Sequence, residues 1–173
     1  MKIPSKLAKF LAKNKIKYEE IRHRTVFTAF DKAATLKIKP GIVGKTLVLI
    51  ADKNIVLALI PGNKNLDMMK LKKTAKAKKV GFISEREMKN KFKGFKIGAL
   101  PPFGEIFKMQ TFVDRGLLKP ARNAPATTSK MWAGAGGGKN IFVNSGIYEA
   151  SLKVSLKIFE KLGAVAGSFS KAK

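Results

Sequence analysis

The clearest hydrophobic pattern in the chain is a pair of apolar runs at 46–51 and 55–60, separated by the polar tripeptide Asp52-Lys53-Asn54. Two apolar runs of strand length around a short polar turn are typical of a β-hairpin. Both runs are apolar at nearly every position rather than at alternate ones. Strands of this kind are covered on both faces, so the sequence predicts a hairpin in the centre of a sheet.

Helix starts are marked by capping-box spacing, in which a Ser or Thr side chain lies three residues before an acidic one. Thr28 with Asp31 and Ser84 with Glu87 have this spacing. The predicted helices are one capped by Ser5, then 29–37, 66–76, 84–92 and 156–162. The predicted strands, besides the hairpin, are 17–24, 80–83, 106–113, 141–143 and 151–154.

Strand pairs alternate with helices along the chain, and this order favours a mixed sheet with helices packed around it. We therefore expect an α/β protein of the α+β type, organised as a single domain over residues 1–173. Residues 119–140 contain two prolines and the glycine-rich stretch 134–138 but no periodic pattern. We expect a flexible loop there rather than a domain boundary, because the apolar run at 141–143 resumes a strand at once.

Composition narrows the class of protein. The 173 residues are 45% hydrophobic, which is normal for a globular chain with one core. There is no cysteine, which excludes a disulfide scaffold, a thiol nucleophile and cysteine-ligated zinc. No run approaches the ~20 apolar residues of a membrane span, and the N-terminus lacks the apolar core of a signal peptide. We therefore expect a cytoplasmic protein that does not associate with a membrane.

The net charge is the compositional feature that says most about the class of ligand. The chain has 36 Lys and Arg against 11 Asp and Glu, a formal net charge of +25. Such a field attracts polyanions, of which nucleic acid is the commonest. Most of these cations are lysine, which contacts phosphate as a point charge rather than reading base edges. The other interpretation is a general lysine bias of the surface, which would carry no functional meaning.

Standard catalytic templates are absent. The sequence has one histidine, His23, and no HExxH, GxSxG or GxxxxGK[ST] motif. Clustered carboxylates suited to a metal are also absent, so no metal site is expected. If the chain is an enzyme, the simplest chemistry is attack of water on an already activated bond that the protein positions.

Two features remain as candidate chemistry. The stretch 98–104, Gly-Ala-Leu-Pro-Pro-Phe-Gly, is apolar and stiff, because proline fixes φ while glycine permits positive φ. It could present its backbone to a small ligand or could be a buried connection. Lys45 follows Gly44 at a strand start, where its amino group could hold a phosphate or an oxyanion, or could simply lie on the surface.

Four stretches occur together in a fixed order: Thr28-Ala29 with Ala33-Ala34, Gly44-Lys45-Thr46-Leu47-Val48-Leu49, the loop 98–104, and Phe142-Val143-Asn144-Ser145-Gly146. With this combination the chain, over about residues 5–165, resembles the YbaK/ProX family of aminoacyl-tRNA deacylases, which is related to the editing domain of bacterial prolyl-tRNA synthetase. The resemblance implies a strongly curved, largely antiparallel mixed sheet surrounded by helices. It also implies a trans-editing enzyme that hydrolyses the ester of mischarged tRNA, with alanine, cysteine or serine on tRNA for proline as substrates.

The resemblance further implies roles for individual residues. Lys45 matches the essential lysine that holds the 3′ end of the tRNA, and Gly98 and Pro102 match the GxxxP loop whose backbone orients the aminoacyl group. The other residues expected around the substrate are Phe27, Thr28, Thr46, Ala99, Leu100, Pro101, Asn144, Ser145 and Gly146. Affinity for the acceptor stem would come from the lysine surface, represented by Lys70, Lys72, Lys73 and Lys76.

The same resemblance implies no cofactor, and it names the partners as the acceptor stem and 3′ end of aminoacyl-tRNA, together with prolyl-tRNA synthetase. In this family the attacking water is helped by the substrate's own groups, which would explain why no general base is visible. Two alternatives stay open. One is a non-catalytic tRNA-binding or ribosome-associated protein with the same fold, and the other is a basic protein that binds nucleic acid without specificity.

Overall fold

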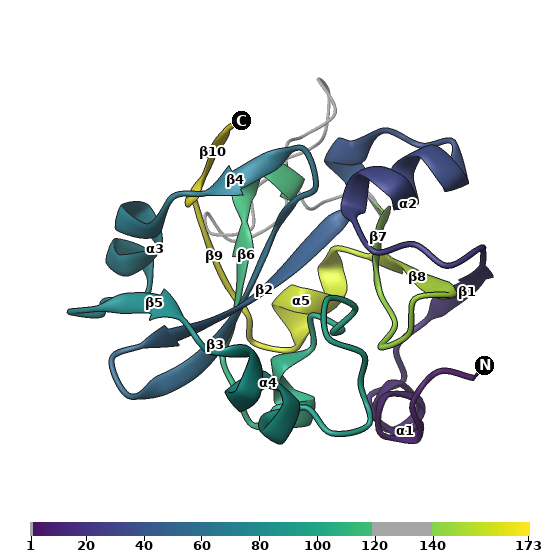
Figure 1. Ribbon diagram of the computed structural model, residues 1–173, viewed down its shortest axis with the longest axis horizontal. Coiled ribbons are helices and arrows are strands. Elements are labelled where there is room, and N and C mark those ends of the chain that lie inside the picture. Colours follow the sequence, from purple (N-terminus) through teal and green to yellow (C-terminus); the bar gives the residue numbers. More distant parts are fainter. Residues whose placement is uncertain (1, 119–139) are drawn as a thin grey trace.

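The computed structural model describes residues 2–118 and 140–173 and has a five-stranded sheet at its centre (Figure 1). In order across the sheet, the strands are β5 (Val80–Phe82), β2 (Gly44–Ala51), β3 (Asn54–Pro61), β6 (Thr111–Asp114) and β9 (Val165–Gly167). The predicted hairpin is confirmed as the antiparallel pair β2 and β3. β5 extends it antiparallel to β2, while β6 and β9 follow β3 in parallel.

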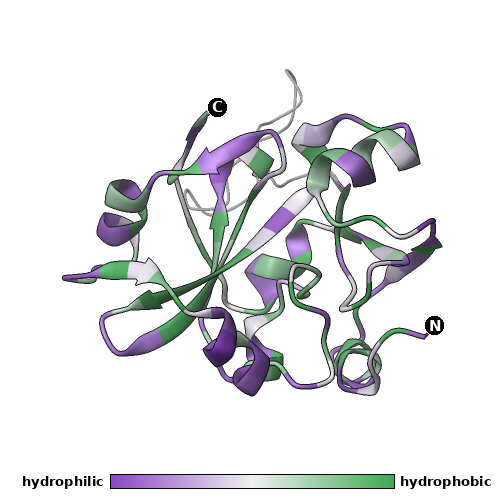
Figure 2. Ribbon diagram, in the orientation of Figure 1, coloured by the Kyte–Doolittle hydropathy of each residue, from purple (hydrophilic) through white to green (hydrophobic). Residues whose placement is uncertain are grey.

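The hairpin is buried on both faces, as its continuous apolar runs predict. Leu57 and Leu59 of β3 pack into one hydrophobic cluster, whereas Ala58 and Ile60 pack into a second one. Successive side chains of a strand point to opposite faces, so the two clusters lie on opposite sides of the sheet. Figure 2 shows these central strands as the most continuously hydrophobic part of the ribbon.

Two smaller sheets flank the central one. The first has the order β1-β8-β7 and the second pairs β10 with β4, all antiparallel. Their strands are β1 (Tyr18–Arg22), β8 (Ala150–Ser155), β7 (Asn140–Asn144), β10 (Ser170–Ala172) and β4 (Lys64–Leu66). A single parallel bridge between Val43 and Phe142 connects the β7 side to the start of β2. The expected mixed α/β fold is confirmed, with its strands divided among three hydrogen-bonded sheets.

Helices surround these sheets (Figure 1). They are α1 (Ser5–Lys13), α2 (Ala29–Leu36), α3 (Met68–Thr74), α4 (Glu85–Lys91) and α5 (Lys157–Lys161), with the short 3-10 helices η1 (Pro40–Ile42), η2 (Gly104–Phe107) and η3 (Arg115–Leu118). Both capping predictions are confirmed: the Thr28 hydroxyl accepts from the Asp31 amide at 3.0 Å, and the Ser84 hydroxyl from the Glu87 amide at 3.2 Å. The prediction for Ser5 is wrong, because Ser5 is already helical and Pro4 is the N-cap.

The segment 106–113 corrects the sequence prediction most clearly. Only its end is a strand, because η2 occupies its start and Lys108 follows with a positive φ of 56°. Within η2, Phe107 packs edge-on against Phe92 and Phe95, with ring centroids 4.7 and 5.0 Å apart. This aromatic packing outweighs the strand propensity of the apolar run.

Other elements differ at their ends. The predicted helix 66–76 starts later, because Leu66 belongs to β4 and Asp67 caps α3 by accepting from the Lys70 amide. The short strands β9 and β10 near the C-terminus were not predicted. The flexible loop expected at 119–140 lies outside the described residues, except for Asn140, where β7 begins. None of the helices in the described ranges combines the length and the apolar character that a membrane span requires.

Candidate functional site

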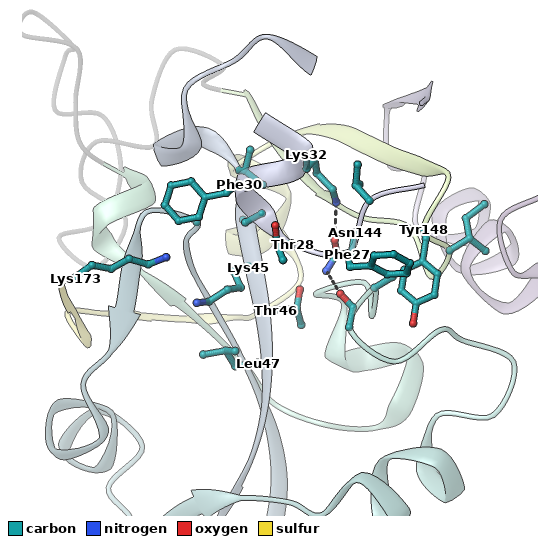
Figure 3. A pocket seen from close by; sticks show the side chains of 18 residues that line it. Phe27, Thr28, Phe30, Lys32, Lys45, Thr46, Leu47, Asn144, Tyr148 and Lys173 are labelled. Carbon is teal, nitrogen blue, oxygen red and sulfur yellow. Dashed lines mark hydrogen bonds between the residues drawn. The ribbon is translucent and has the colours of Figure 1, made fainter. Parts of the chain in front are cut away.

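A pocket of about 420 Å³ lies along the free part of the β2 edge, between α2 and β7 (Figure 3). β5 pairs with β2 only at Leu49–Ala51, and the bridge at Val43 lies just before β2 begins. Among the described residues, the edge between these points carries no further strand, so the pocket can form there. Its lining comes from residues within 26–32, 43–47, 98–99 and 144–148, with Gly62 and Lys173.

The pocket gathers residues that are far apart in the sequence. Of the residues singled out from the sequence, those that line it are Phe27, Thr28, Lys45, Thr46, Gly98, Ala99 and Asn144. They come from the start of α2, from β2, from the loop 98–104 and from the end of β7. A pocket of this size assembled from several segments is the usual form of a small-ligand site.

The rest of the loop 98–104 lies behind this lining. Leu100, Pro101 and Pro102 are buried and do not line the pocket. The Pro102 carbonyl accepts a hydrogen bond from the Thr111 hydroxyl at 3.3 Å, which ties the loop to β6. Gly98 and Ala99 thus line the pocket, whereas the prolines form a buried connection behind them.

The turn after β7 also supports the pocket from behind. Ser145 is fully buried and its hydroxyl donates to the Ala150 carbonyl at 2.6 Å. The Gly146 amide donates to the Ala99 carbonyl at 2.7 Å, which joins the turn to the loop 98–104. Gly146 and Gly98 have φ of +90° and +86°, values that favour glycine. Ser145 and Gly146 thus hold the lining in place without forming part of it.

The lysines proposed from the sequence for tRNA lie elsewhere. Lys70, Lys72 and Lys73 belong to α3, with Lys76 just after it, and none of the four lines the pocket. In Figure 1, α3 lies at the left, beside β4 and β5, whereas α2 lies at the upper right, near the start of β2. Lys70, Lys73 and Lys76 are exposed, and Lys72 is half-buried. The structure therefore separates two lysine groups, one in the pocket and one on this outer face.

Lys45 is half-buried in the pocket wall, on β2 opposite Ile60 of β3. Burial lowers the pKa of its amino group below the usual lysine value, and the positive charge of Lys173 lowers it further. Both causes penalise the charged form of an amine. An anion bound at this position would offset both, so the setting favours a phosphate or another negatively charged ligand.

Lys32 is a pocket residue that sequence reasoning missed. It is 5% exposed, and its Nζ donates to Asn144 Oδ1 at 2.6 Å (Figure 3). Asn144 Nδ2 in turn donates to the Gly98 carbonyl at 3.5 Å, so a chain of side-chain contacts connects α2, β7 and the loop. Burial lowers the pKa of Lys32 to about 8. A signal was present in the sequence, because Lys32 lies three residues after Ala29 and next to Ala33, on the inward face of α2.

Phe30, Tyr148 and Lys173 also line the pocket and were not predicted. Lys173 Nζ lies 4.0 Å from the centroid of the Phe30 ring. These residues belong to no recognisable sequence motif. Lys173 reaches the pocket only because β10 pairs with β4, a contact between segments about 100 residues apart that local patterns do not report.

The polar side chains of the lining are hydroxyls, one amide and lysine amines. The Thr46 hydroxyl is inaccessible to solvent and has no hydrogen-bond partner among the described residues, so its hydrogen-bonding capacity is unused in this structure. Within residues 2–118 and 140–173, no Asp, Glu, His or Cys lines the pocket. His23 lies outside it, with Nε2 2.8 Å from the Ser151 hydroxyl. In the described ranges, no three His, Cys, Asp or Glu side chains come together as metal ligands.

Comparison with known families decides the class of protein. The family described as "Aminoacyl-tRNA editing domain" matches residues 23–124, more than half of the chain. The chain belongs to this family. The match covers α2, β2 and the loop 98–104, and therefore most of the pocket lining. The resemblance found in the sequence is thereby confirmed at the level of the family.

A relative from Enterococcus faecalis, named "Putative Cys-tRNA(Pro)/Cys-tRNA(Cys) deacylase EbsC", is 33% identical over 87 residues, which are 50% of this chain and 52% of the relative. The chain thus spans about half the length of this relative.

Two crystal structures share the fold. A hypothetical protein has a TM-score of 0.78 at 21% identity, over 96% of this chain and all of the other. "A putative trans-editing enzyme for prolyl tRNA synthetase" has a TM-score of 0.73 at 20% identity, over 99% of this chain and all of the other.

Proposed function

We propose that this editing-domain protein is an aminoacyl-tRNA deacylase that acts in trans and uses the pocket beside β2 as its active site. The observation that carries the proposal is the convergence of Lys45, Thr46 and Gly98 on one pocket, within the segment that matches the family. The reaction is hydrolysis: water adds to the ester carbonyl carbon, the bond to the ribose oxygen breaks, and free amino acid and tRNA are released. We further propose that residues 1–173 form one editing domain that works in the cytoplasm.

In this reaction the protein positions the substrate and does not itself activate the attacking water. The Lys45 ammonium binds the phosphate of the 3′-terminal nucleotide, and the backbone at Gly98 and Ala99 orients the aminoacyl group. Thr46 forms part of the pocket wall next to Lys45. Pro102 acts indirectly, by stiffening the loop from its buried side. Since the described part of the lining contains no carboxylate or imidazole, we propose that the substrate's own groups help the attacking water.

We propose alanine, cysteine or serine attached to tRNA for proline as the substrate. A pocket excludes a larger side chain by steric conflict more effectively than a synthetase site rejects a smaller one, which is the logic of a second sieve. The name of the Enterococcus faecalis relative supports cysteine as a member of this group. The description of the second crystal structure as a trans-editing enzyme for prolyl tRNA synthetase supports this synthetase as a functional partner.

The outer lysines would then serve the body of the tRNA. Lys70, Lys72, Lys73 and Lys76 lie outside the pocket, and we propose that they contact acceptor-stem phosphates. Lysine–phosphate contacts add affinity without reading sequence. Their separation from the pocket assigns affinity and chemistry to different groups of lysines.

The test is single-turnover deacylation of tRNA for proline charged in turn with alanine, cysteine, serine or proline. Wild type is compared with Lys45→Ala and with Lys53→Ala, an exposed lysine in the β2–β3 turn that serves as the matched control. We expect rapid release of at least one non-cognate amino acid, retention of proline, and loss of release only in Lys45→Ala. No release above the spontaneous rate on any substrate would contradict the proposal and favour a tRNA-binding protein that retains the fold.

A further inference from the structure

Two exposed aromatic rings stand at the mouth of the pocket. In the described part of the chain, the large hydrophobic side chains that are most exposed are Tyr18, Phe27, Phe30, Met69 and Phe82. Phe27 is 66% exposed and Phe30 is 48% exposed, and both line the pocket. Exposed apolar surface gathered beside a cavity marks a contact surface rather than the scattered exposure that is normal for proteins.

Phe27 is held in place despite its exposure. Its ring meets Tyr148 edge-on at a centroid distance of 4.9 Å. The Tyr148 hydroxyl donates to the Ile97 carbonyl at 2.5 Å, and the Val26 amide donates to the Tyr148 carbonyl at 3.1 Å. These contacts fix the ring from one side and leave the rest of it open, so a flat ligand could stack on it without first ordering the side chain.

Phe30 stands across the mouth from Phe27, as Figure 3 shows, with Lys45 on the wall between them. Lys173 Nζ lies 4.0 Å from the Phe30 ring centroid, within the range of a cation–π contact. One side of the mouth thus combines an aromatic face with cations. Among the described residues, no Asp or Glu lines the pocket to neutralise these charges.

Aromatic faces next to unneutralised lysines are the combination that binds single-stranded nucleic acid. Bases stack on the rings, and the phosphates between the bases pair with the cations. We propose that Phe27 and Phe30 are stacking surfaces for the unpaired bases of an RNA 3′ end, with the intervening phosphate held by Lys45 and Lys173. This inference rests on the proposed function, since it places the 3′ end at the same pocket, but it concerns binding and not hydrolysis.

The test measures affinity for an RNA hairpin that carries a short unpaired 3′ end and no attached amino acid. Affinity is measured by fluorescence anisotropy over a series of KCl concentrations. The variants are Phe27→Leu and Phe30→Leu, which keep an apolar side chain but remove the aromatic face. Phe82→Leu is the matched control, because Phe82 is 63% exposed on β5 and does not line the pocket. The second probe is the same hairpin with abasic nucleotides in the unpaired end.

We expect each pocket variant to weaken binding about tenfold, the scale of one lost base–aromatic stack, with an unchanged slope of log affinity against log salt. Phe82→Leu should bind like wild type. On the abasic hairpin, wild type should lose affinity and should no longer differ from Phe27→Leu and Phe30→Leu. Lys173→Ala should instead reduce the salt slope by about 1, as expected for one phosphate contact.

Three results would overturn the inference: equal affinity of wild type for the intact and abasic hairpins, an equal loss of affinity in Phe82→Leu, or a persistent defect of the pocket variants on abasic RNA. The abasic comparison uses wild type alone, so it decides the matter even if a variant fails to fold. The hairpin carries no amino acid, so binding is measured separately from deacylation. If binding depends on the bases but the protein does not deacylate aminoacyl-tRNA, the proposed function is contradicted and this inference stands. If the protein deacylates aminoacyl-tRNA but binding does not depend on the bases, this inference is overturned and the proposed function stands.

Discussion

Lysines of identical chemistry occupy two different settings in this protein. Lys32 and Lys45 line a pocket, where burial lowers the pKa of both amino groups. Lys70 and Lys73 are exposed on α3, outside the pocket. A net charge of +25 describes both groups equally and therefore cannot say which of them belongs to an active site. The difference is made by the backbone around them: a free stretch of β2, a glycine loop and a turn that close around one group only.

The largest effect should come from breaking the turn that supports the pocket. In Gly146→Ala the new Cβ would lie 2.8 Å from atoms of both Phe95 and Pro4, at a φ of +90°. We expect the free energy of unfolding to fall by about 3 kcal/mol, from strain and overpacking together. Urea unfolding measures this change.

Gly163→Ala separates the two causes. Gly163 also has a positive φ, of +77°, but no atom lies within 4 Å of its added Cβ. This variant should therefore lose only the part that is due to backbone strain, about 1 kcal/mol. Equal losses in the two variants would show that the turn at Gly146 is not tightly packed, and the support that it gives to the pocket lysines would then be doubtful.

The second effect concerns Lys32 and pH. Its pKa falls from 10.5 to about 8 on folding, so between these values the unfolded chain binds the proton more tightly than the folded one. The penalty is fully present below pH 8 and is relieved as pH rises toward 10.5. Wild type should therefore gain on the order of 3 kcal/mol over this window relative to Lys32→Met.

The measurement is urea unfolding of wild type and Lys32→Met at several pH values in this window. Lys53→Met is the control, since it also removes one lysine but from an exposed turn. A gain of similar size in wild type relative to Lys53→Met would assign the effect to general titration of the lysine surface. Parallel pH curves for wild type and Lys32→Met would mean that Lys32 is not buried as a charged group.

The smallest effects should come from the outer lysines. Lys70→Ala and Lys73→Ala should each lower tRNA affinity a few-fold, independent of sequence, and should reduce the salt slope by about 1. Deacylation of bound substrate should stay at the wild-type rate. Titration of uncharged tRNA over a salt series measures the slopes, and an unchanged slope in both variants would remove α3 from the tRNA interface.

The parts of the fold that were predictable from the sequence depend on local chemistry. The hairpin follows from two continuous apolar runs, and the starts of α2 and α4 follow from Thr28 and Ser84, whose side chains make the capping bonds. The segment 106–113 was misjudged because Phe107 packs against rings from another part of the chain. Such tertiary packing leaves no periodic signal in the segment itself.

The residues of the candidate site also fall into two groups, those that local sequence patterns predict and those that only the fold brings together. Lys45 and Gly98 could be singled out because a lysine after a glycine at a strand start, and a glycine-proline loop, are visible motifs. Lys32 looked like one more surface lysine, and its burial depends on a partner, Asn144, that is 112 residues away. Phe30 and Lys173 meet only through the pairing of β10 with β4. Contacts of this range are decided by the fold as a whole.

The most direct measurement separates the two groups of lysines in one assay. Single-turnover deacylation and tRNA affinity are measured in parallel for wild type, Lys45→Ala and Lys73→Ala, on tRNA for proline charged with the best substrate of the panel. If the pocket is the catalytic site, Lys45→Ala lowers the deacylation rate about 100- to 1000-fold, far more than the few-fold loss of affinity expected for one phosphate contact. Lys73→Ala weakens affinity with an unchanged rate. A Lys45→Ala variant that deacylates as fast as wild type would contradict the assignment of the pocket.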